Sequence, residues 1–512
     1  MAAPRRFTRR AALQLTLVGA GAAILAACAA PAPTPTTAPA QPAQPAAAPP
    51  TATPATAAPA QPTPTPAPAK PTTVAPTATP APVGVATPTA IPAATPYLRQ
   101  GVKAIEFWFQ WGGMTGINAI RTVANRFNEK TTAFQINSLQ VAQLPDKMLT
   151  AIAGGTPPDV AVNGPYAEFW ARGAALSLDD RINASAVIKR GDFFEANWRL
   201  AGWKGKTYGV PVIECFLRWG LSWNEELVEK AGLNREKPPQ TFDELYEWHT
   251  KITTFDQAKN VKVLGFDPMD AMAAGAGGAN PFFYGAAWGF KHFDEEKLQF
   301  NFDNPDFVDV LTTIKRFYDF VGAEKVDGFR KSYGTWTQSP TASFPSGVEG
   351  LIINGYWQPG ELVKSAPGRK FGYSWVPMPT KRKGVKLQAA SGHYSYLPKG
   401  SKAQDEGFQF IEYLVTDPAM DIIFAETGWL GAKKAYVAKI DPKTYPGLDF
   451  YIRSATEATE MVGSAVDPIQ AFTYNQWVQA VDKVKFGDRT PEQAAKELHK
   501  TLNDEIRKRG FA

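Results

Sequence analysis

A tract of proline, alanine, threonine and glutamine fills residues 29–96 and most constrains what this chain can fold into. Lys70 is the one charged residue of the tract and large apolar side chains are almost absent, so the tract cannot bury a core. Proline at every second or third position favours polyproline II, with a reach between about 45 Å as a random coil and about 210 Å fully extended. We expect residues 28–98 to be a disordered spacer.

The segment before the spacer has the pattern of an export signal joined to a lipid anchor. Arg9-Arg10 precede an uncharged stretch, which ends in the lipobox-like Leu25-Ala26-Ala27-Cys28. We therefore expect residues 1–27 to be a lipoprotein signal peptide of the twin-arginine type and Cys28 to be lipidated. A transmembrane anchor is the alternative, but the stretch is at the lower limit of what spans a bilayer.

These features predict a protein that works outside the cytoplasm, anchored to the outer face of a cell membrane or in a periplasm.

The formal net charge of +6 includes four arginines of the first 27 residues, so the mature chain carries +2. A balance this small does not point to nucleic acid or anionic lipid as a partner. With Cys28 lipidated, Cys215 has no cysteine to pair with and is expected to be a small buried hydrophobe.

No metal or cofactor site is expected. The four histidines are dispersed along the chain, and the spacings of zinc sites are missing. Residues 303–306 lack the glycine and terminal glutamate of a calcium loop and are expected to start a helix. The chain has no P-loop and no nucleophile elbow, and the glycines of 275–278 do not follow a convincing strand.

From about Tyr97 onward, aromatic residues and regular turns predict a globular body too long for one ordinary core. Apolar strands at 103–110, 134–140 and 160–162 alternate with helical patterns, which favours a parallel sheet flanked by helices. Ligands of such sheets bind beyond the carboxyl ends of the strands. Gln110-Trp111 and Asn163-Gly164-Pro165-Tyr166 both lie at such ends.

Several motifs then follow in a characteristic order. They are GGTPPDV at 154–160, YGVP at 208–211, WNEEL at 223–227, INGYW at 353–357, YLVTDP at 413–418 and GDRTP at 487–491. With this order and spacing, the chain beyond the spacer resembles the family 1 extracellular solute-binding proteins of ABC importers, the group that includes maltose-binding protein. No single motif is diagnostic of that family.

The resemblance implies an α/β, two-lobed periplasmic-binding-protein-like fold of type II, in which each lobe is a sheet flanked by helices and hinge strands cross between the lobes. The solute-binding domain would be residues 99–512. Lobe 1 would comprise about 99–213 and 395–432, and lobe 2 about 214–394 and 433–512. The expected crossings lie at 208–221, near 393–397 and beyond Gly431.

The resemblance also implies a solute receptor that delivers its ligand to the membrane subunits of an ABC permease, acts as a monomer and catalyses nothing. The residues expected to contact the ligand are Gln110, Trp111, Asn163, Tyr166, Glu214, Arg218, Tyr284, Trp288, Trp357, His393 and Trp429. Trp357 is the closest positional match. For four of these residues a purely structural role is the alternative: an ion pair for Glu214 and Arg218, a chain turn for Asn163, and a hinge position for His393.

Carbohydrate is the expected solute on chemical grounds too. Sugar rings present flat C–H faces that stack on aromatic rings, and their hydroxyls pair with planar polar groups such as Asn, Gln, Glu and Arg. A polyol or another non-sugar solute in the same fold is the alternative. A secreted carbohydrate-active enzyme with Glu214 and Asp267 as its carboxylate pair is a weaker rival, because such pairs occur in almost any chain of this size.

Overall fold

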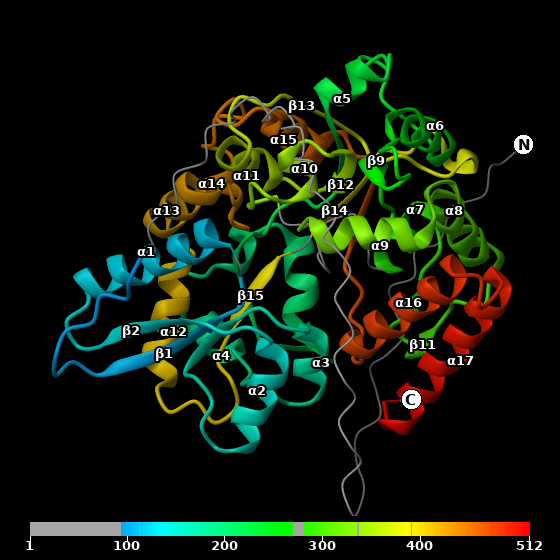
Figure 1. Cartoon of the computed structure of the whole chain (residues 1–512). Coiled ribbons are helices and arrows are strands. Elements are labelled where there is room, and N and C mark those ends of the chain that lie inside the picture. Colours follow the sequence, from blue (N-terminus) through cyan, green and yellow to red (C-terminus); the bar gives the residue numbers. More distant parts are fainter. Residues whose placement is uncertain (1–93, 112, 270–280, 335–336, 391, 512) are drawn as a thin grey trace, which may run out of the picture. The chain divides into compact units, whose positions relative to one another are not determined.

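The computed structural model of the protein describes residues 94–111, 113–269, 281–334, 337–390 and 392–511 (Figure 1). The expected signal peptide, Cys28 and most of the expected spacer fall outside these residues, as do Trp336 and the glycines of 275–278.

Short apolar runs with glycine turns build the first sheet, in which strands from distant parts of the chain pair. Its spatial order is β2 (Gln135–Gln140), β1 (Ala104–Phe109), β3 (Val160–Val162), β15 (His393–Tyr396), β6 (Val210–Ile213). The three strands expected from the sequence pair in parallel, and β15 enters antiparallel between β3 and β6. The predicted parallel sheet is confirmed, with one strand inserted from far along the chain.

Amphipathic helices cover this sheet. In α1 (Met114–Lys130), the predicted apolar face buries Ile120, Val123 and Phe127, and the helix packs against β2 and α13. The remaining helices here are α2 (Leu144–Ala153), α3 (Tyr166–Ala171), α4 (Asp179–Ala184), α12 (Gln404–Leu414), α13 (Asp417–Thr427), α14 (Lys434–Val437) and the 3₁₀ segments η1 (Arg190–Asp192) and η2 (Glu195–Ala201). We call the first sheet with these helices the first lobe.

A second sheet takes its strands from the middle of the chain. Its order is β13 (Phe371–Ser374), β7 (Gly220–Asn224), β12 (Glu349–Asn354), β9 (Val261–Phe266), β8 (Thr254–Phe255). Every residue of β7 and β12 is buried, as expected for central strands covered on both faces. We call this sheet with its helices the second lobe.

The longest helices of the second lobe, α8, α16 and α17, pack against one another (Figure 1). The helices of this lobe are α5 (Glu225–Lys230), α6 (Phe242–Ile252), α7 (Pro281–Trp288), α8 (Pro305–Val321), α9 (Ala323–Ser332), α10 (Ser343–Ser346), α11 (Gln358–Ser365), α15 (Leu448–Glu457), α16 (Gln470–Lys485) and α17 (Pro491–Lys508), with the 3₁₀ segment η3 (Thr380–Arg382). As predicted, 303–306 starts a helix: the Asn304 side chain caps α8.

Three short strand pairs complete the secondary structure. They are β4 (Gly202–Trp203) with β5 (Lys206–Thr207), β10 (Phe293–Asp294) with β11 (Gln299–Phe300), and β14 (Leu387–Ala390) with β16 (Glu460–Gly463). The first two are antiparallel and the third is parallel. In the described part of the chain, no helix combines the length and the apolar character needed to cross a bilayer.

Residues 214–219 carry the chain from β6 in the first sheet to β7 in the second. Gln388 on β14 holds this crossing, since its side-chain oxygen accepts the backbone N–H of Trp219 at 2.7 Å and its side-chain nitrogen donates to Trp219 O at 3.0 Å. The crossing therefore lies inside the range 208–221 expected from the sequence.

Candidate functional site

Aromatic and polar side chains from several loops meet where the first sheet leads into the crossing. Trp111 follows β1, Asn163 follows β3, Glu214 follows β6, and His393 begins β15. We call the set Trp111, Asn163, Tyr166, Glu214, His393 and Trp429 the junction cluster. All six were expected as ligand contacts. Trp111, Asn163 and Glu214 follow β1, β3 and β6, which run in the same direction, so the carboxyl ends of these strands bring the three residues to one edge of the sheet.

Trp111 is the centre of the cluster. Its indole Nε1 donates to Glu214 Oε2 at 2.9 Å, and its ring centroid lies 4.9 Å from that of His393 and 5.3 Å from that of Trp429. Only 5% of the Trp111 side chain is exposed. The Trp111 ring thus packs against both other rings, and the Glu214 carboxylate fixes its N–H.

Glu214 has the left-handed backbone conformation with a φ of 54° and accepts from two rings. Besides the Trp111 indole, His393 Nε2 lies 2.8 Å from Glu214 Oε2. Burial raises the pKa of the Glu214 carboxyl, but the charge and hydrogen bond of His393, the charge of Arg218 and the Trp111 N–H outweigh that effect and hold the pKa below its usual value. The carboxylate is thus ionised, and His393, Arg218 and the Trp111 N–H stabilise its negative charge.

The other ring nitrogen of His393, Nδ1, lies 3.0 Å from Asn163 Nδ2 and 3.3 Å from the Tyr166 hydroxyl. The Tyr166 hydroxyl in turn accepts the backbone N–H groups of Asn163 and Tyr394, each at 3.0 Å. The Asn163 amide can donate only to an unprotonated nitrogen, so in the neutral ring the proton is on Nε2 and points at Glu214. The network therefore sets the orientation of the imidazole.

Asn163 both turns the chain and contacts the cluster. Its φ of 79° lies in the left-handed region that asparagine tolerates, and its side-chain oxygen accepts the backbone N–H of Gln110 at 3.1 Å. The predicted Gln110 is therefore tied to the cluster through its backbone. Asn163 therefore turns the chain, and its contact with a ligand stays a prediction.

Arg218 and Trp357 adjoin the cluster from the crossing and from the second lobe. The guanidinium carbon of Arg218 lies 5.4 Å from the centroid of the Trp357 ring, a cation–π distance, and Trp357 is 5% exposed. Arg218 also lowers the pKa of Glu214 by its charge. Arg218 on the crossing thus lies against an indole of the second lobe and acts by its charge on the Glu214 carboxylate.

The indole of Trp429 is held by a residue that the sequence analysis missed. Trp429 Nε1 donates to Glu361 Oε1 at 3.1 Å. Glu361 is on α11 and its N–H donates to the carbonyl of Trp357, four residues earlier, at 3.2 Å. Residues at i and i+4 share a helix face, so this spacing from Trp357 was the signal that could have identified Glu361.

Tyr284 and Trp288 are not part of this arrangement. Both are on α7 in the core of the second lobe, where Tyr284 donates to Pro268 O at 2.6 Å and Trp288 Nε1 donates to Asp309 at 2.7 Å. Phe242 and Trp477 pack against them. The structure therefore brings nine of the eleven predicted residues together and places these two elsewhere.

Two further residues from the sequence analysis also have clear places. Cys215 is buried beside the cluster, its backbone N–H donates to Leu430 O at 2.7 Å, and burial raises the pKa of its thiol. Asp267, half of the enzyme hypothesis, pairs with Arg330 at 2.8 Å and accepts from Tyr318 at 2.7 Å in the second lobe. Its partners are therefore not those of Glu214.

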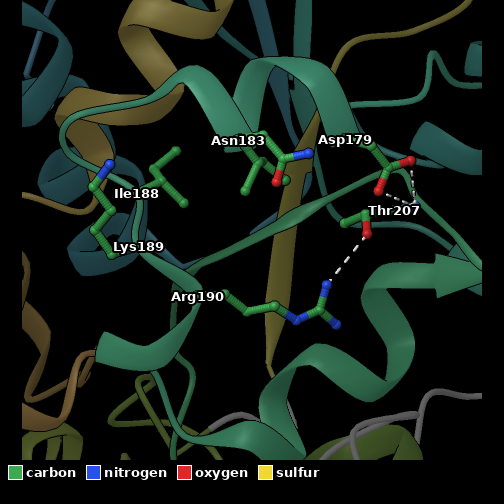
Figure 2. Close-up of a pocket in the computed structure, with 7 residues that line it drawn as sticks. Asp179, Asn183, Ile188, Lys189, Arg190 and Thr207 are labelled. Carbon is green, nitrogen blue, oxygen red and sulfur yellow. Dashed lines mark hydrogen bonds between the residues drawn. The ribbon is translucent and has the colours of Figure 1, made fainter.

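A separate hollow of about 200 Å³ lies on the first lobe (Figure 2). Asp179 accepts the backbone N–H of Thr207 at 3.1 Å, and Arg190 Nη1 lies 3.5 Å from the Thr207 hydroxyl. None of the predicted ligand residues lines it. Among the described residues, no three His, Cys, Asp or Glu side chains are grouped closely enough to hold a metal ion.

The sequence profile of the family described as "Bacterial extracellular solute-binding protein" matches residues 111–421, more than half of the chain. That range contains every residue of the junction cluster except Trp429, and it contains Glu361. A comparison with curated proteins finds no match.

Solved structures share the fold at low sequence identity. CpMnBP1 with mannotriose bound is 22% identical, with a TM-score of 0.69 over 78% of this chain and 100% of that one. An ABC transporter solute-binding protein from Thermotoga lettingae, bound with alpha-D-tagatose, is 19% identical, with a TM-score of 0.65 over 78% and 99%. The maltose/maltodextrin-binding domain MalE from Bdellovibrio bacteriovorus, bound to maltotriose, is 17% identical, with a TM-score of 0.63 over 79% and 100%. The predicted two-lobed fold is confirmed.

Proposed function

Because the chain belongs to the bacterial extracellular solute-binding protein family, we propose that it is the receptor of an ABC importer and that a carbohydrate binds at the junction cluster. The observation that carries the proposal is the grouping of Trp111, Trp429 and Trp357 with Glu214 and Arg218. Indole faces stack on the C–H faces of a sugar, and carboxylate and guanidinium groups bind its hydroxyls in pairs.

The burial of the three indoles indicates how the solute would reach them. Trp111 and Trp357 are 5% exposed and Trp429 is 1% exposed. A sugar can stack on such rings only after the lobes separate. We infer a hinge-closure receptor, in which the bound solute favours the closed form and the closed form docks on the permease.

The named ligands of the similar structures support the choice of solute class. They include mannotriose, maltotriose and tagatose, so both oligosaccharides and a monosaccharide are represented. These proteins share under 25% identity with this chain, and their ligands do not identify its own. We propose a mono- or oligosaccharide, with a polyol as the alternative.

The remaining expectations join this proposal. Residues 1–27 would be the signal peptide, lipidated Cys28 the anchor, and 28–98 the spacer that carries the receptor domain 99–512. Lobe 1 would comprise about 99–213 and 395–432, and lobe 2 the rest. The mature protein would work as a monomeric, non-catalytic lipoprotein outside the cytoplasm, bound to the membrane subunits of its permease.

A thermal-shift screen tests the proposed solute class. Purified protein is heated with sugars, polyols, amino acids and phosphorylated compounds at concentrations far above a micromolar Kd. A ligand that binds only the folded state raises the melting temperature, by about 2 °C or more under these conditions. We expect hits among sugars, and hits confined to amino acids or phosphorylated compounds would overturn the carbohydrate assignment.

Matched variants then locate the site. Trp111→Ala should weaken binding of the sugar detected in the screen by at least about tenfold, as measured by calorimetry, because it removes the central ring of the cluster. Trp203→Ala is the control, since Trp203 lies on β4 and its ring packs on that of Phe511. Equal losses in the two variants would place the sugar somewhere other than the junction cluster.

A further inference from the structure

Glu361 gathers three hydrogen-bond donors on one buried carboxyl group. Trp429 Nε1 donates to Oε1 at 3.1 Å, the Gln338 side-chain nitrogen donates to Oε1 at 3.0 Å, and the Thr337 hydroxyl is hydrogen-bonded to Oε2. The residue is 4% exposed. A buried carboxyl with this many directed partners is held in one position and holds its partners in turn.

The bond to Trp429 joins parts of the chain that are 68 residues apart. Glu361 is on α11, which follows β12 of the second sheet, whereas Trp429 follows α13, which packs on α1 of the first lobe. The two segments touch at the backbone, because a Cβ on Gly360 would lie 2.6 Å from the Cα of Gly428. The carboxyl therefore reaches the indole across the line where the lobes meet.

The far side of the Trp429 ring is closed by α1. A Cβ on Gly116 would lie 2.8 Å from Cη2 of Trp429 and 3.5 Å from the Gln338 side-chain oxygen. The ring is thus wedged between α1 and the Trp111 ring, and its N–H points at Glu361. Within this packing, Glu361 supplies the bond that sets the rotation of the indole.

The charges around Glu361 make this an unusual choice of acceptor. Its three partners are uncharged, and burial together with the negative charge of Glu214 raises the pKa of the carboxyl to about 7. The basic residues of this region have other partners: Arg218 acts on Glu214, and Lys364 on α11 donates to the carbonyls of Ala425 and Glu426. An amide of the same shape would avoid the cost of burying this acid.

We propose that Glu361 is the positioning residue for Trp429, fixing that indole as a wall of the carbohydrate site from the opposite lobe. The inference rests on the proposed function and adds to it a residue that does not itself touch the sugar. The Glu361 carboxyl can position Trp429 in either protonation state, because Oε1 accepts the indole N–H in both and a protonated Oε2 donates to the Thr337 hydroxyl.

Affinity for the sugar detected in the thermal screen provides the first test. Glu361→Ala should weaken binding about tenfold, the typical effect of losing a directed hydrogen bond in a buried site, and Glu361→Gln should recover affinity to within about threefold. Asp467→Asn is the matched control: Asp467 is another buried acid, with its pKa raised by burial to about 7, on the loop before α16. A loss in E361Q as large as in E361A would overturn the proposal.

A double-mutant cycle separates positioning from a general structural role. Trp429→Phe keeps an aromatic wall but has no N–H for Glu361 to accept. If Glu361 acts through that N–H, Glu361→Ala in the W429F background should weaken binding less than twofold further. Additive losses in the double variant would show that Glu361 acts through another residue.

A readout that needs no ligand distinguishes failure of this inference from failure of the proposed function. The chain has 14 tryptophans, and 5-fluorotryptophan labelling makes each a ¹⁹F NMR signal, with Trp429 assigned by its loss in W429F. We expect E361A to shift or broaden the Trp429 signal while E361Q and D467N leave it in place. An unchanged signal in E361A would overturn the inference, whereas an absence of sugar binding by the wild type alongside the expected ¹⁹F shift would overturn only the carbohydrate function.

Discussion

Buried acids with opposite pKa shifts lie close together in the junction. Glu214 has its pKa lowered because His393, Arg218 and the Trp111 N–H outweigh its burial, whereas burial raises the pKa of Glu361 to about 7. The difference follows from partners: Glu214 has cationic groups beside it, and the hydrogen-bond partners of Glu361 are neutral. Asp467 in the second lobe resembles Glu361, with burial raising its pKa to about 7.

The raised pKa of Glu361 predicts a pH dependence of stability at the residue scale. Between its ordinary pKa of 4.5 and about 7, the folded protein keeps a proton that the unfolded chain releases, so this contribution is complete below pH 4.5 and is lost as pH rises through 7. E361Q cannot titrate. Its free energy of unfolding relative to the wild type should therefore rise by roughly 3 kcal/mol between pH 4.5 and pH 8.

Urea unfolding of both proteins across that pH range measures the difference. Other titrating groups are common to the two proteins and cancel, apart from those coupled to Glu361 such as Glu214. A constant difference at every pH would mean that Glu361 is ionised throughout the range.

Helix starts show the clearest link from sequence to structure at the element scale. Side chains of Asn224, Thr241, Asn304 and Thr490 cap α5, α6, α8 and α17. At Thr241 the capping box is incomplete: Thr241 accepts the N–H of Glu244, but the Glu244 carboxylate accepts the N–H of Gln240 at 2.7 Å. The chain approaching α6 places the Gln240 N–H nearer the carboxylate.

The full capping box at Thr490 gives an element-scale prediction. Its hydroxyl accepts the N–H of Gln493 at 3.3 Å and the Gln493 side chain accepts the N–H of Thr490 at 3.1 Å. Thr490→Ala should lower the free energy of unfolding by about 1 kcal/mol, because an N–H at the start of α17 loses its partner. Thr312→Ala, on the exposed face of α8, is the control and should change it by less than about 0.5 kcal/mol. Equal effects in urea unfolding would show that the cap contributes nothing specific.

For the whole molecule, the proposed function would make solute binding at the junction and lobe closure one event. The first lobe contributes Trp111 and Trp429, the second contributes Trp357 and Glu361, and the crossing contributes Glu214 and Arg218. A solute in contact with the three indoles must touch both lobes. Its binding energy therefore favours the closed form over the open one.

Solution scattering checks this prediction. Saturating sugar, with saturation confirmed by calorimetry, should lower the radius of gyration of the wild type. At the same sugar concentration W111A, which binds at least about tenfold more weakly, should show a smaller decrease. Scattering that stays the same in saturated wild type would rule out closure as the response to the solute.

Local physical rules account for the predictions that succeeded. Apolar runs located β1, β2 and β3, and the strand–turn–helix pattern placed Trp111, Asn163 and Trp357 at strand ends, where parallel strands are known to gather ligand residues. The caps at Asn304 and Thr241 also depend on neighbours within four residues. Such features are encoded in the spacing of the sequence and need no knowledge of the rest of the fold.

Long-range packing decided the rest. Tyr284 and Trp288 have the composition of a sugar-binding loop, but α7 turns them into the core of the second lobe, where Pro268 O and Asp309 satisfy their donors. Glu361 meets Trp429 only because α11 and α13 are brought into contact by two different sheets. The sequence by itself determined the elements, their order and the family, because those depend on short-range patterns. The tertiary structure decided which indoles lie together and which acid orients Trp429, since both depend on how distant segments pack.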